Sequence, residues 1–107
     1  MKKTIQLLQN FEQGSYNSPS YLAFARTFKS EFKKQLEGVG AKLHKFNVGH
    51  FYFSGFFTKG EKMYYFSWHN GDVNLMYRTA KHDKDFTGGS NQWVRISEDI
   101  ASQLVLN

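Results

Sequence analysis

The stretch His50–Thr79, HFYFSGFFTKGEKMYYFSWHNGDVNLMYRT, decides the fold of this chain. Short runs of aromatic and branched side chains fill it, and turn-forming pairs separate the runs, which is typical of β-strands joined by tight hairpins. Asn70-Gly71 is the strongest turn signal, because both residues accept the positive backbone angles of a type I′ turn. Lys59-Gly60 is a second, weaker signal. The stretch therefore predicts consecutive antiparallel strands.

A fourth, weaker strand is predicted before this stretch, joined to it by a turn at Val48-Gly49. In chain order the four predicted strands are Ala41–Asn47, His50–Thr58, Met63–His69 and Val73–Thr79. A sheet of this kind has one apolar face that must be buried against another element. Helices on either side of the strands are the natural cover.

The main helix is predicted directly before the first strand. Ser18 supplies a capping hydroxyl, and Pro19 takes the first helical position, where a missing N–H has no consequence. The helix ends at Gly38 and Gly40, because glycine accepts the left-handed conformation found at helix ends. Its apolar stripe, at the spacing of one helix face, consists of Tyr21, Ala25, Phe28, Phe32 and Leu36.

Two shorter helices are predicted near the ends of the chain. One is Thr4–Phe11, and the other begins at Ser97, with Glu98 and Asp99 close to its positive end. Together the elements predict a single α+β domain over residues 1–107. In it, N-terminal helices pack on a four-stranded antiparallel β-meander, and a polar loop and a C-terminal helix follow.

The predicted turns also set the strand register, which decides the sheet face that each side chain occupies. A two-residue turn at Asn70-Gly71 places Phe66 opposite Leu75. A two-residue turn at Lys59-Gly60 places Phe53 opposite Phe66. The face formed in this way is continuously apolar, so it is assigned to the core beneath the main helix.

The second face mixes rings, short polar groups and cations. It carries His50, Tyr52, Ser54, Phe56, Met63, Tyr65, Ser67, His69, Asp72, Asn74, Met76 and Arg78, with Lys45 beside Tyr52. Sheets that recognise RNA stack bases on such rings. We therefore expect Tyr52, Phe56 and Tyr65 to stack bases. Arg78 and Lys45 are expected to hold phosphate. The alternative, that a terminal segment covers part of this face, stays open.

Composition limits the classes of partner. The formal net charge of +5 points to an anionic partner such as nucleic acid or an acidic protein face. The absence of cysteine excludes disulfides and thiolate metal sites and favours a reducing compartment, the cytoplasm. No apolar run approaches the roughly 20 residues that a membrane span needs, so no membrane partner is expected.

The polar loop Tyr77–Val94 is the expected place for partner contacts, since exposed loops commonly carry binding residues. Lys81, His82 and Lys84 would extend the surface around Arg78. Backbone N–H groups and hydroxyls suited to an anion come from Thr87, Gly88, Gly89, Ser90 and Asn91. A plain turn is the alternative, and the segment is not a P-loop, because no Gly-Lys-Ser/Thr follows.

A basic stripe lies beside the apolar stripe of the main helix. It consists of Arg26, Lys29 and Lys33. These cations could follow a phosphate backbone, and an ordinary solvated helix face is the alternative.

Two kinds of chemistry are alternatives to binding. His82, Asp83 and Asp85 could supply a general base for a small hydrolase or nuclease, although their spacing is no known catalytic signature. His50, His69 and Asp72 could hold a divalent ion, but ordinary surface histidines are the simpler interpretation. No metal and no cofactor are therefore expected.

The segments FNVGHFYFSGFFTKG and RTAKHDKDFTGGSNQ resemble those of small uncharacterised proteins found on conjugative elements and phages of gut bacteria. The resemblance covers roughly the middle half of the chain and transfers no catalytic residue. It implies a mobile-element protein that binds nucleic acid or disables host defence, for example an anti-CRISPR inhibitor of a CRISPR–Cas nuclease. The basic charge departs from the acidic DNA-mimic type of inhibitor.

The sequence thus predicts a non-enzymatic protein that binds nucleic acid or a nucleoprotein effector. The hydrolase and a structural homodimeric module remain as alternatives.

Overall fold

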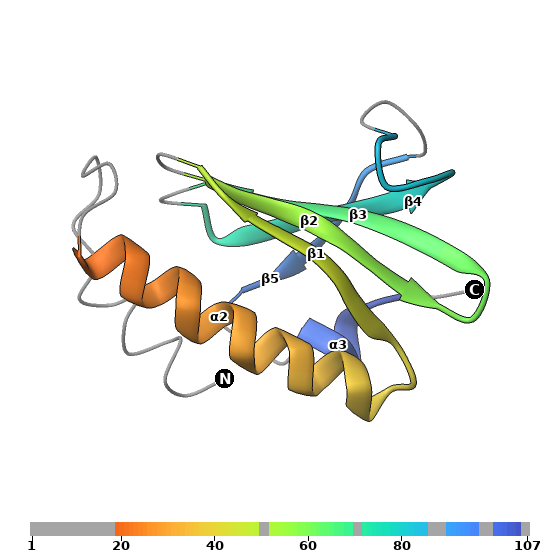
Figure 1. The fold of residues 1–107 in the computed structure, drawn as a ribbon, viewed down its shortest axis with the longest axis horizontal. Helices are drawn as coiled ribbons and strands as arrows, with labels where there is room; N and C mark the ends of the chain where they lie inside the picture. Colours follow the sequence, from red (N-terminus) through yellow and green to blue (C-terminus); the bar gives the residue numbers. More distant parts are fainter. Residues whose placement is uncertain (1–18, 50–51, 70–71, 86–89, 97–99, 106–107) are drawn as a thin grey trace.

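The computed structural model describes residues 19–49, 52–69, 72–85, 90–96 and 100–105 (Figure 1). The predicted helix Thr4–Phe11, the cap Ser18 and the residues Ser97, Glu98 and Asp99 lie outside these ranges.

The fold is α+β, as predicted, with one long helix before an antiparallel sheet and a short helix after it (Figure 1). The five strands lie in the sheet in the order in which they follow along the chain. The elements are α2 (Pro19–Gly38), β1 (Lys42–Val48), β2 (Tyr52–Lys59), β3 (Lys62–His69), β4 (Asn74–Ala80), β5 (Gln92–Arg95) and α3 (Ile100–Gln103). The prediction of four strands is wrong, because Gln92–Arg95 forms a fifth within and just beyond the segment assigned to the polar loop.

Helix α2 ends as its glycines predict. Gly40 has a φ of 78°, in the left-handed region. The N–H of Ala41 donates to the carbonyl of Leu36 at 2.8 Å, and that of Gly40 to the carbonyl of Glu37 at 3.1 Å. These two bonds form a Schellman motif, which satisfies carbonyls at the helix end and turns the chain into β1.

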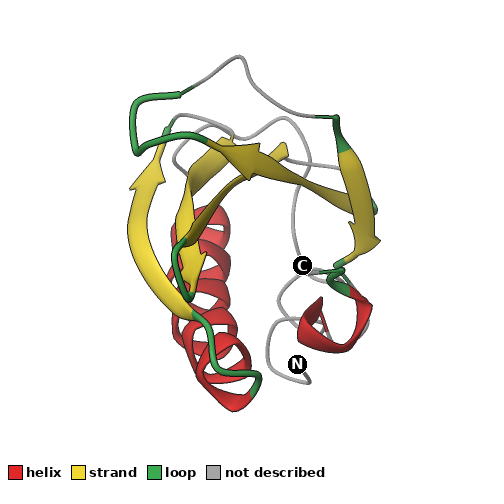
Figure 2. Cartoon of the chain, turned by 90° about the vertical axis from the view of Figure 1, so that its right-hand side faces the viewer, coloured by secondary structure: helices red, strands yellow, loops and turns green. Residues whose placement is uncertain are grey.

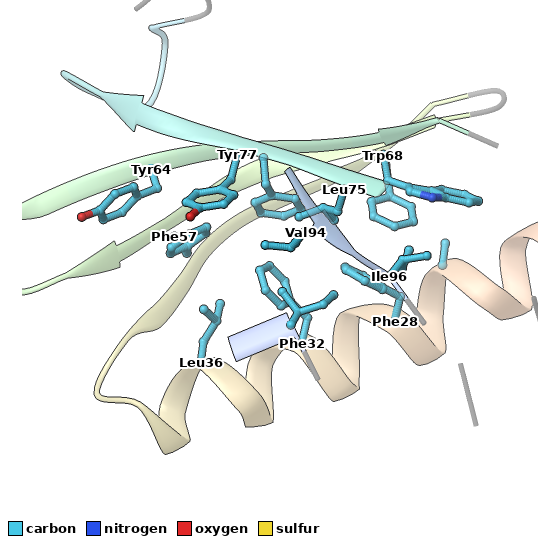
Figure 3. Packing of buried hydrophobic residues seen from close by; sticks show 14 of the residues in the cluster. Phe28, Phe32, Leu36, Phe57, Tyr64, Trp68, Leu75, Tyr77, Val94 and Ile96 are labelled. Atoms are coloured by element: carbon cyan, nitrogen blue, oxygen red, sulfur yellow. The ribbon is translucent and has the colours of Figure 1, made fainter. Parts of the chain in front are cut away.

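The sheet curves over α2 and α3, and its apolar face lies against them (Figures 2 and 3). The rings of Phe24 and Trp68 have centroids 4.8 Å apart, and those of Phe28 and Phe53 4.6 Å apart. Ala25, Phe28, Phe32 and Leu36 of the predicted stripe are buried, and Phe24 joins them. The side chain of Tyr21 lies outside the described part of the chain.

The register of β2 and β3 differs from the prediction by two residues. Lys59 pairs with Lys62 and Phe53 with Trp68. The two-residue turn is therefore Gly60-Glu61, because Gly60 takes the positive φ of 62° that a hairpin turn needs at its first central position.

The register of β3 and β4 is also shifted by two, so that Phe66 pairs with Tyr77 rather than with Leu75. Two carbonyls before β4 accept donors that are not part of the β3–β4 ladder. The indole Nε1 of Trp68 donates to the carbonyl of Asp72 at 2.8 Å, and the N–H of Ile96 donates to that of Val73 at 3.0 Å. An even shift leaves each side chain on its face, so the assignment of faces is confirmed even though the pairs are wrong.

Strand β1 contains a β-bulge between Leu43 and Lys45, and this moves Lys45 opposite Phe56 instead of beside Tyr52. Gly55 faces Phe46 across the ladder. A Cβ on Gly55 would overlap the carbonyl oxygen of Lys45 and lie 2.9 Å from Cζ of Phe66. The close approach of β1 at the bulge therefore requires glycine.

Candidate nucleic-acid interface

The candidate site is the outer face, which we define as the side of the sheet turned away from α2. The strand pairings arrange its side chains in rows that run across the strands. The Arg78 row consists of Lys45, Phe56, Tyr65 and Arg78. Next to it lies a row of Asn47, Ser54, Ser67, Met76 and Trp93, and then come the pairs Tyr52–His69 and Asn74–Arg95.

The Arg78 row is covered. Arg78 lies on the outer face, as predicted, but it is only 4% exposed, and Phe56 is 1% exposed. The guanidinium carbon of Arg78 sits 4.6 Å from the ring centroid of Tyr65. Its two terminal nitrogens donate to the carbonyls of Asp85 at 2.9 Å and of Thr79 at 3.1 Å. The expectation of an exposed Phe56 is therefore wrong, and Arg78 is already engaged within the chain.

The cover is the first part of the polar loop, Lys81–Asp85, which we call the cover loop. It is closed by its own hydrogen bonds. The N–H of Lys81 donates to Oδ2 of Asp85 at 2.9 Å, that of Asp85 to the carbonyl of His82 at 3.1 Å, and that of Lys84 to Nδ1 of His82 at 3.1 Å. These bonds make the cover loop a compact turn that folds back over the sheet.

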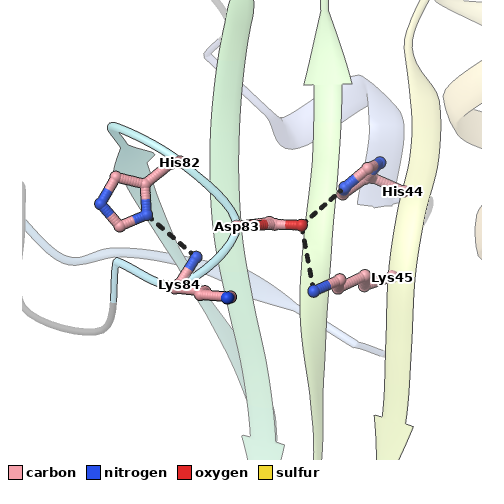
Figure 4. Close-up of polar contacts among 5 residues, drawn as sticks. All are labelled: His44, Lys45, His82, Asp83 and Lys84. Atoms are coloured by element: carbon pink, nitrogen blue, oxygen red, sulfur yellow. Dashed lines mark hydrogen bonds and ion pairs between the residues drawn. The ribbon is translucent and has the colours of Figure 1, made fainter.

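Asp83 fixes the cover loop to the far edge of the sheet (Figure 4). One carboxylate oxygen, Oδ2, lies 3.0 Å from Nζ of Lys45 and 3.2 Å from Nε2 of His44. The bulge in β1 brings these two consecutive side chains to the same carboxylate, since a bulge re-aims side chains that would otherwise alternate. The hydrogen bond from Lys45, followed by that from His44, lowers the pKa of Asp83 below its ordinary value of 3.8.

The lowered pKa of Asp83 makes its contribution to folding stability depend on pH. When folding lowers the pKa of a carboxyl, the ionised carboxylate stabilises the folded state at pH values above its pKa in the unfolded chain. This stabilisation is lost as the pH falls through the pKa of the folded state. We expect the Asp83 carboxyl to titrate with a midpoint below 3.8 in a carbon-13 NMR titration. Lys45→Met should move the midpoint upward. A wild-type midpoint at or above the ordinary value would contradict the ion pair.

Beyond the Arg78 row, the outer face carries partly exposed aromatic rings. Tyr52 is 40% exposed, and its ring stacks with that of His69 at 5.6 Å between centroids and 24° between planes. Trp93 is 58% exposed on β5, two residues before the exposed Arg95. We call Tyr52, His69, Trp93 and Arg95 the ring platform.

Sequence reasoning missed the roles of Trp93 and Arg95 because they lie in the unpredicted strand β5. The sequence around β5 does contain a signal for a strand. Val94 and Ile96 are buried while Trp93 and Arg95 point outward, and this period of two is typical of a half-buried strand. His69 is predicted on this face of the sheet, as an ordinary surface histidine or a metal ligand, but not as a stacking ring.

The remaining predicted residues do not gather at one place. Lys81, His82 and Lys84 are exposed on the cover loop. Arg26, Lys29 and Lys33 are exposed on α2, which packs against the opposite face of the sheet, so this stripe does not continue the outer face. Ser90 and Asn91 are exposed, and Thr87, Gly88 and Gly89 lie outside the described residues.

The side chains of the predicted catalytic set contact different groups. His82, Asp83 and Asp85 contact three different partners, which are the Lys84 N–H, the His44–Lys45 pair and the Lys81 N–H. Within the described ranges there is no group of three or more His, Cys, Asp or Glu residues that could hold a metal ion. His50 is not among the described residues.

A cavity of about 380 Å³ opens at the end of the sheet, and its side chains are mostly neutral and polar. Its lining residues are Tyr64, Tyr77, Arg78, Thr79, Ser90, Gln92 and Val105. The hydroxyl of Tyr77, which points toward the core side, accepts the N–H of Val105 at 2.9 Å. Tyr64 and Tyr77 lie on the sheet face opposite the ring platform, and no ring-platform residue is among the lining residues, although Arg78 of the outer face is.

In the part of the chain that the structure covers, no helix is long and apolar enough to cross a membrane. Comparison of the chain with protein-family models, with curated proteins and with solved structures found no match.

Proposed function

We propose that this protein is a non-enzymatic, cytoplasmic nucleic-acid-binding protein. It binds single-stranded nucleic acid on its outer face, either alone or within a nucleoprotein effector. The observation that carries the proposal is the ring platform. It presents an exposed indole, an exposed Arg95 and a stacked Tyr52–His69 pair on one face of the sheet, in a chain of net charge +5.

The chemistry of the platform fits unpaired bases. Each base has a flat face that stacks on an aromatic ring, and a stack contributes about 1–3 kcal/mol. Arg95 supplies a guanidinium that can pair with phosphate or stack on a base. In a duplex the base faces are already stacked on one another, so the rings would have nothing to contact.

Exposed cations supply attraction for the phosphate backbone. Lys81 and Lys84 are exposed on the cover loop, and Arg95 is exposed on β5. A phosphate contact on a single strand adds about 0.7 to the slope of log affinity against log salt concentration. Three such contacts give an expected slope of about −2.

Fluorescence anisotropy with labelled single-stranded and duplex oligonucleotides at several salt concentrations tests the proposal. We expect the single strand to bind more tightly than the duplex, with affinity that falls as salt rises. Absence of binding to either oligonucleotide at low salt would refute a nucleic-acid partner.

The most specific form of the proposal is an inhibitor of a host-defence nucleoprotein such as a CRISPR–Cas nuclease. The resemblance to mobile-element proteins supports this setting, and the basic charge favours contact with nucleic acid in the complex over mimicry of it. A pull-down from host cells, with and without nuclease treatment, tests it. A bound protein that is lost on nuclease treatment is expected, whereas recovery of no nucleoprotein would contradict this form.

A homodimeric interaction module is the second candidate. The observation in its favour is the internal pairing of the cover loop, which leaves Trp93 as a large exposed apolar side chain on the outer face. Large aromatic side chains are enriched at protein interfaces. Static light scattering on the purified protein distinguishes the candidates, because only the module requires twice the monomer mass.

A further inference from the structure

The contact between Asp83 and β1 has the form of an anion-binding site with its own occupant. Two consecutive residues, His44 and Lys45, direct nitrogen atoms at a single oxygen of one carboxylate. A phosphate oxygen has the same need for charged donors as a carboxylate oxygen. The bulge in β1 builds the pair into the sheet, so the pair does not depend on Asp83 for its position along the strand.

The cover loop that carries Asp83 is held together by its own hydrogen bonds. Its internal hydrogen bonds join Lys81, His82, Lys84 and Asp85 to one another. Contacts between the loop and the outer face include those of Asp83 with β1 and of the Asp85 carbonyl with Arg78. Asp83 is the one that spans the sheet, from the end of β4 to β1 (Figure 4).

We propose that His44 and Lys45 form a phosphate site for nucleic acid, and that Asp83 occupies this site until a phosphate group displaces it. Displacement frees the cover loop and uncovers Phe56, Tyr65 and Arg78. The uncovered row adds two rings and a guanidinium to the outer face beside the ring platform. The inference rests on the proposed function, because it names the regulation of the same surface.

The exposure of the three side chains makes such competition feasible. The side chain of Asp83 is 33% exposed, and those of His44 and Lys45 are 43% and 42% exposed. Ion pairs at this level of exposure are weak and screened by salt. A strand that already contacts the ring platform presents its phosphates at high effective concentration, which favours their exchange for the tethered carboxylate.

Asp83→Asn tests the inference, because asparagine keeps the shape of the side chain and removes its charge. We expect single-stranded oligonucleotide to bind about threefold more tightly, since a weak surface contact no longer holds the loop closed. The salt slope should steepen by about 0.7 to 1.4, for one or two new phosphate contacts at Lys45 and Arg78. Circular dichroism confirms that the variant is folded.

Glu37→Gln is the matched control. Glu37 is exposed at the end of α2, and the substitution changes the net charge by the same amount away from the outer face. Equal affinities and equal slopes for the two variants would overturn the inference. The double variant Asp83→Asn/Lys45→Met should lose the gain, and retention of the gain would also overturn it.

Inorganic pyrophosphate separates a failure of this inference from a failure of the proposed function. In Asp83→Asn, NMR resonances of His44 and Lys45 should shift on adding pyrophosphate, and in the wild type they should shift less. Such shifts without any oligonucleotide binding would refute the proposed function and support the phosphate site. Oligonucleotide binding without such shifts would support the function and refute the phosphate site.

Discussion

Replacing Trp93 with alanine is expected to weaken single-stranded oligonucleotide binding by about 5- to 100-fold. The reason is that a base stacked on an indole contributes about 1–3 kcal/mol, and each 1.4 kcal/mol corresponds to about a factor of ten. Trp93 is 58% exposed, so its removal leaves no cavity in the core and the fold should persist. Anisotropy titrations measure the loss, and the salt slope should stay unchanged because no cation is removed.

Two variants control for Trp93→Ala. Trp93→Phe keeps a flat ring and should retain most of the affinity. Val105→Ala removes another exposed apolar side chain, one that lines the cavity on the opposite face, and should leave affinity unchanged. Equal weakening by Trp93→Ala and Val105→Ala would contradict a role for the ring platform.

Gly55→Ala is expected to lower the free energy of unfolding by about 3 kcal/mol, at the upper end of the usual range for overpacking. The added Cβ would overlap the backbone carbonyl of Lys45 and press on the ring of Phe66, so the cost falls on backbone that cannot rotate away. For a domain of this size the melting temperature should fall by more than about 10 °C.

Thermal and urea denaturation measure this effect, with Gly38→Ala as the control. A Cβ at Gly38 would meet no atom within 4 Å, and alanine is a better helix former, so stability should stay the same or rise. The same Gly55→Ala variant should also weaken the contact of Asp83 with His44 and Lys45, because the displaced carbonyl belongs to the bulge. A melting temperature equal to that of the wild type would show that β1 does not lie as close to β2 as described.

The division of the sheet into two faces could be predicted from the sequence, because side chains alternate along a strand. The shifts of two residues at Gly60-Glu61 and before β4 changed the partners of Phe53 and Phe66 without moving them to the other face. A shift of one residue would have reversed the assignment. The prediction of faces was therefore safer than the prediction of pairs.

The cover over the Arg78 row could not be predicted, because it depends on contacts between residues far apart in the chain. His44 and Asp83 are 39 positions apart, and their contact depends on a bulge that the pattern of β1 does not indicate. Charged residues such as Lys81 and Asp83 are typical of a solvated loop, so their pattern does not indicate that this segment folds back over Phe56. Strand β5 was missed for a different reason, since its alternation of side chains is short and overlaps the segment assigned to the polar loop.

The most direct test of a nucleic-acid interface on the outer face uses the two tryptophans of the chain as reporters in one experiment. The indole N–H of Trp68 is buried and donates to the carbonyl of Asp72, whereas the indole of Trp93 is exposed on the ring platform. In a nitrogen-15 NMR titration of the wild-type protein with a single-stranded oligonucleotide, the Trp93 indole signal should shift or broaden while the Trp68 signal stays in place. A titration in which binding occurs but the Trp93 signal does not change, with shifts confined to α2, would contradict the account.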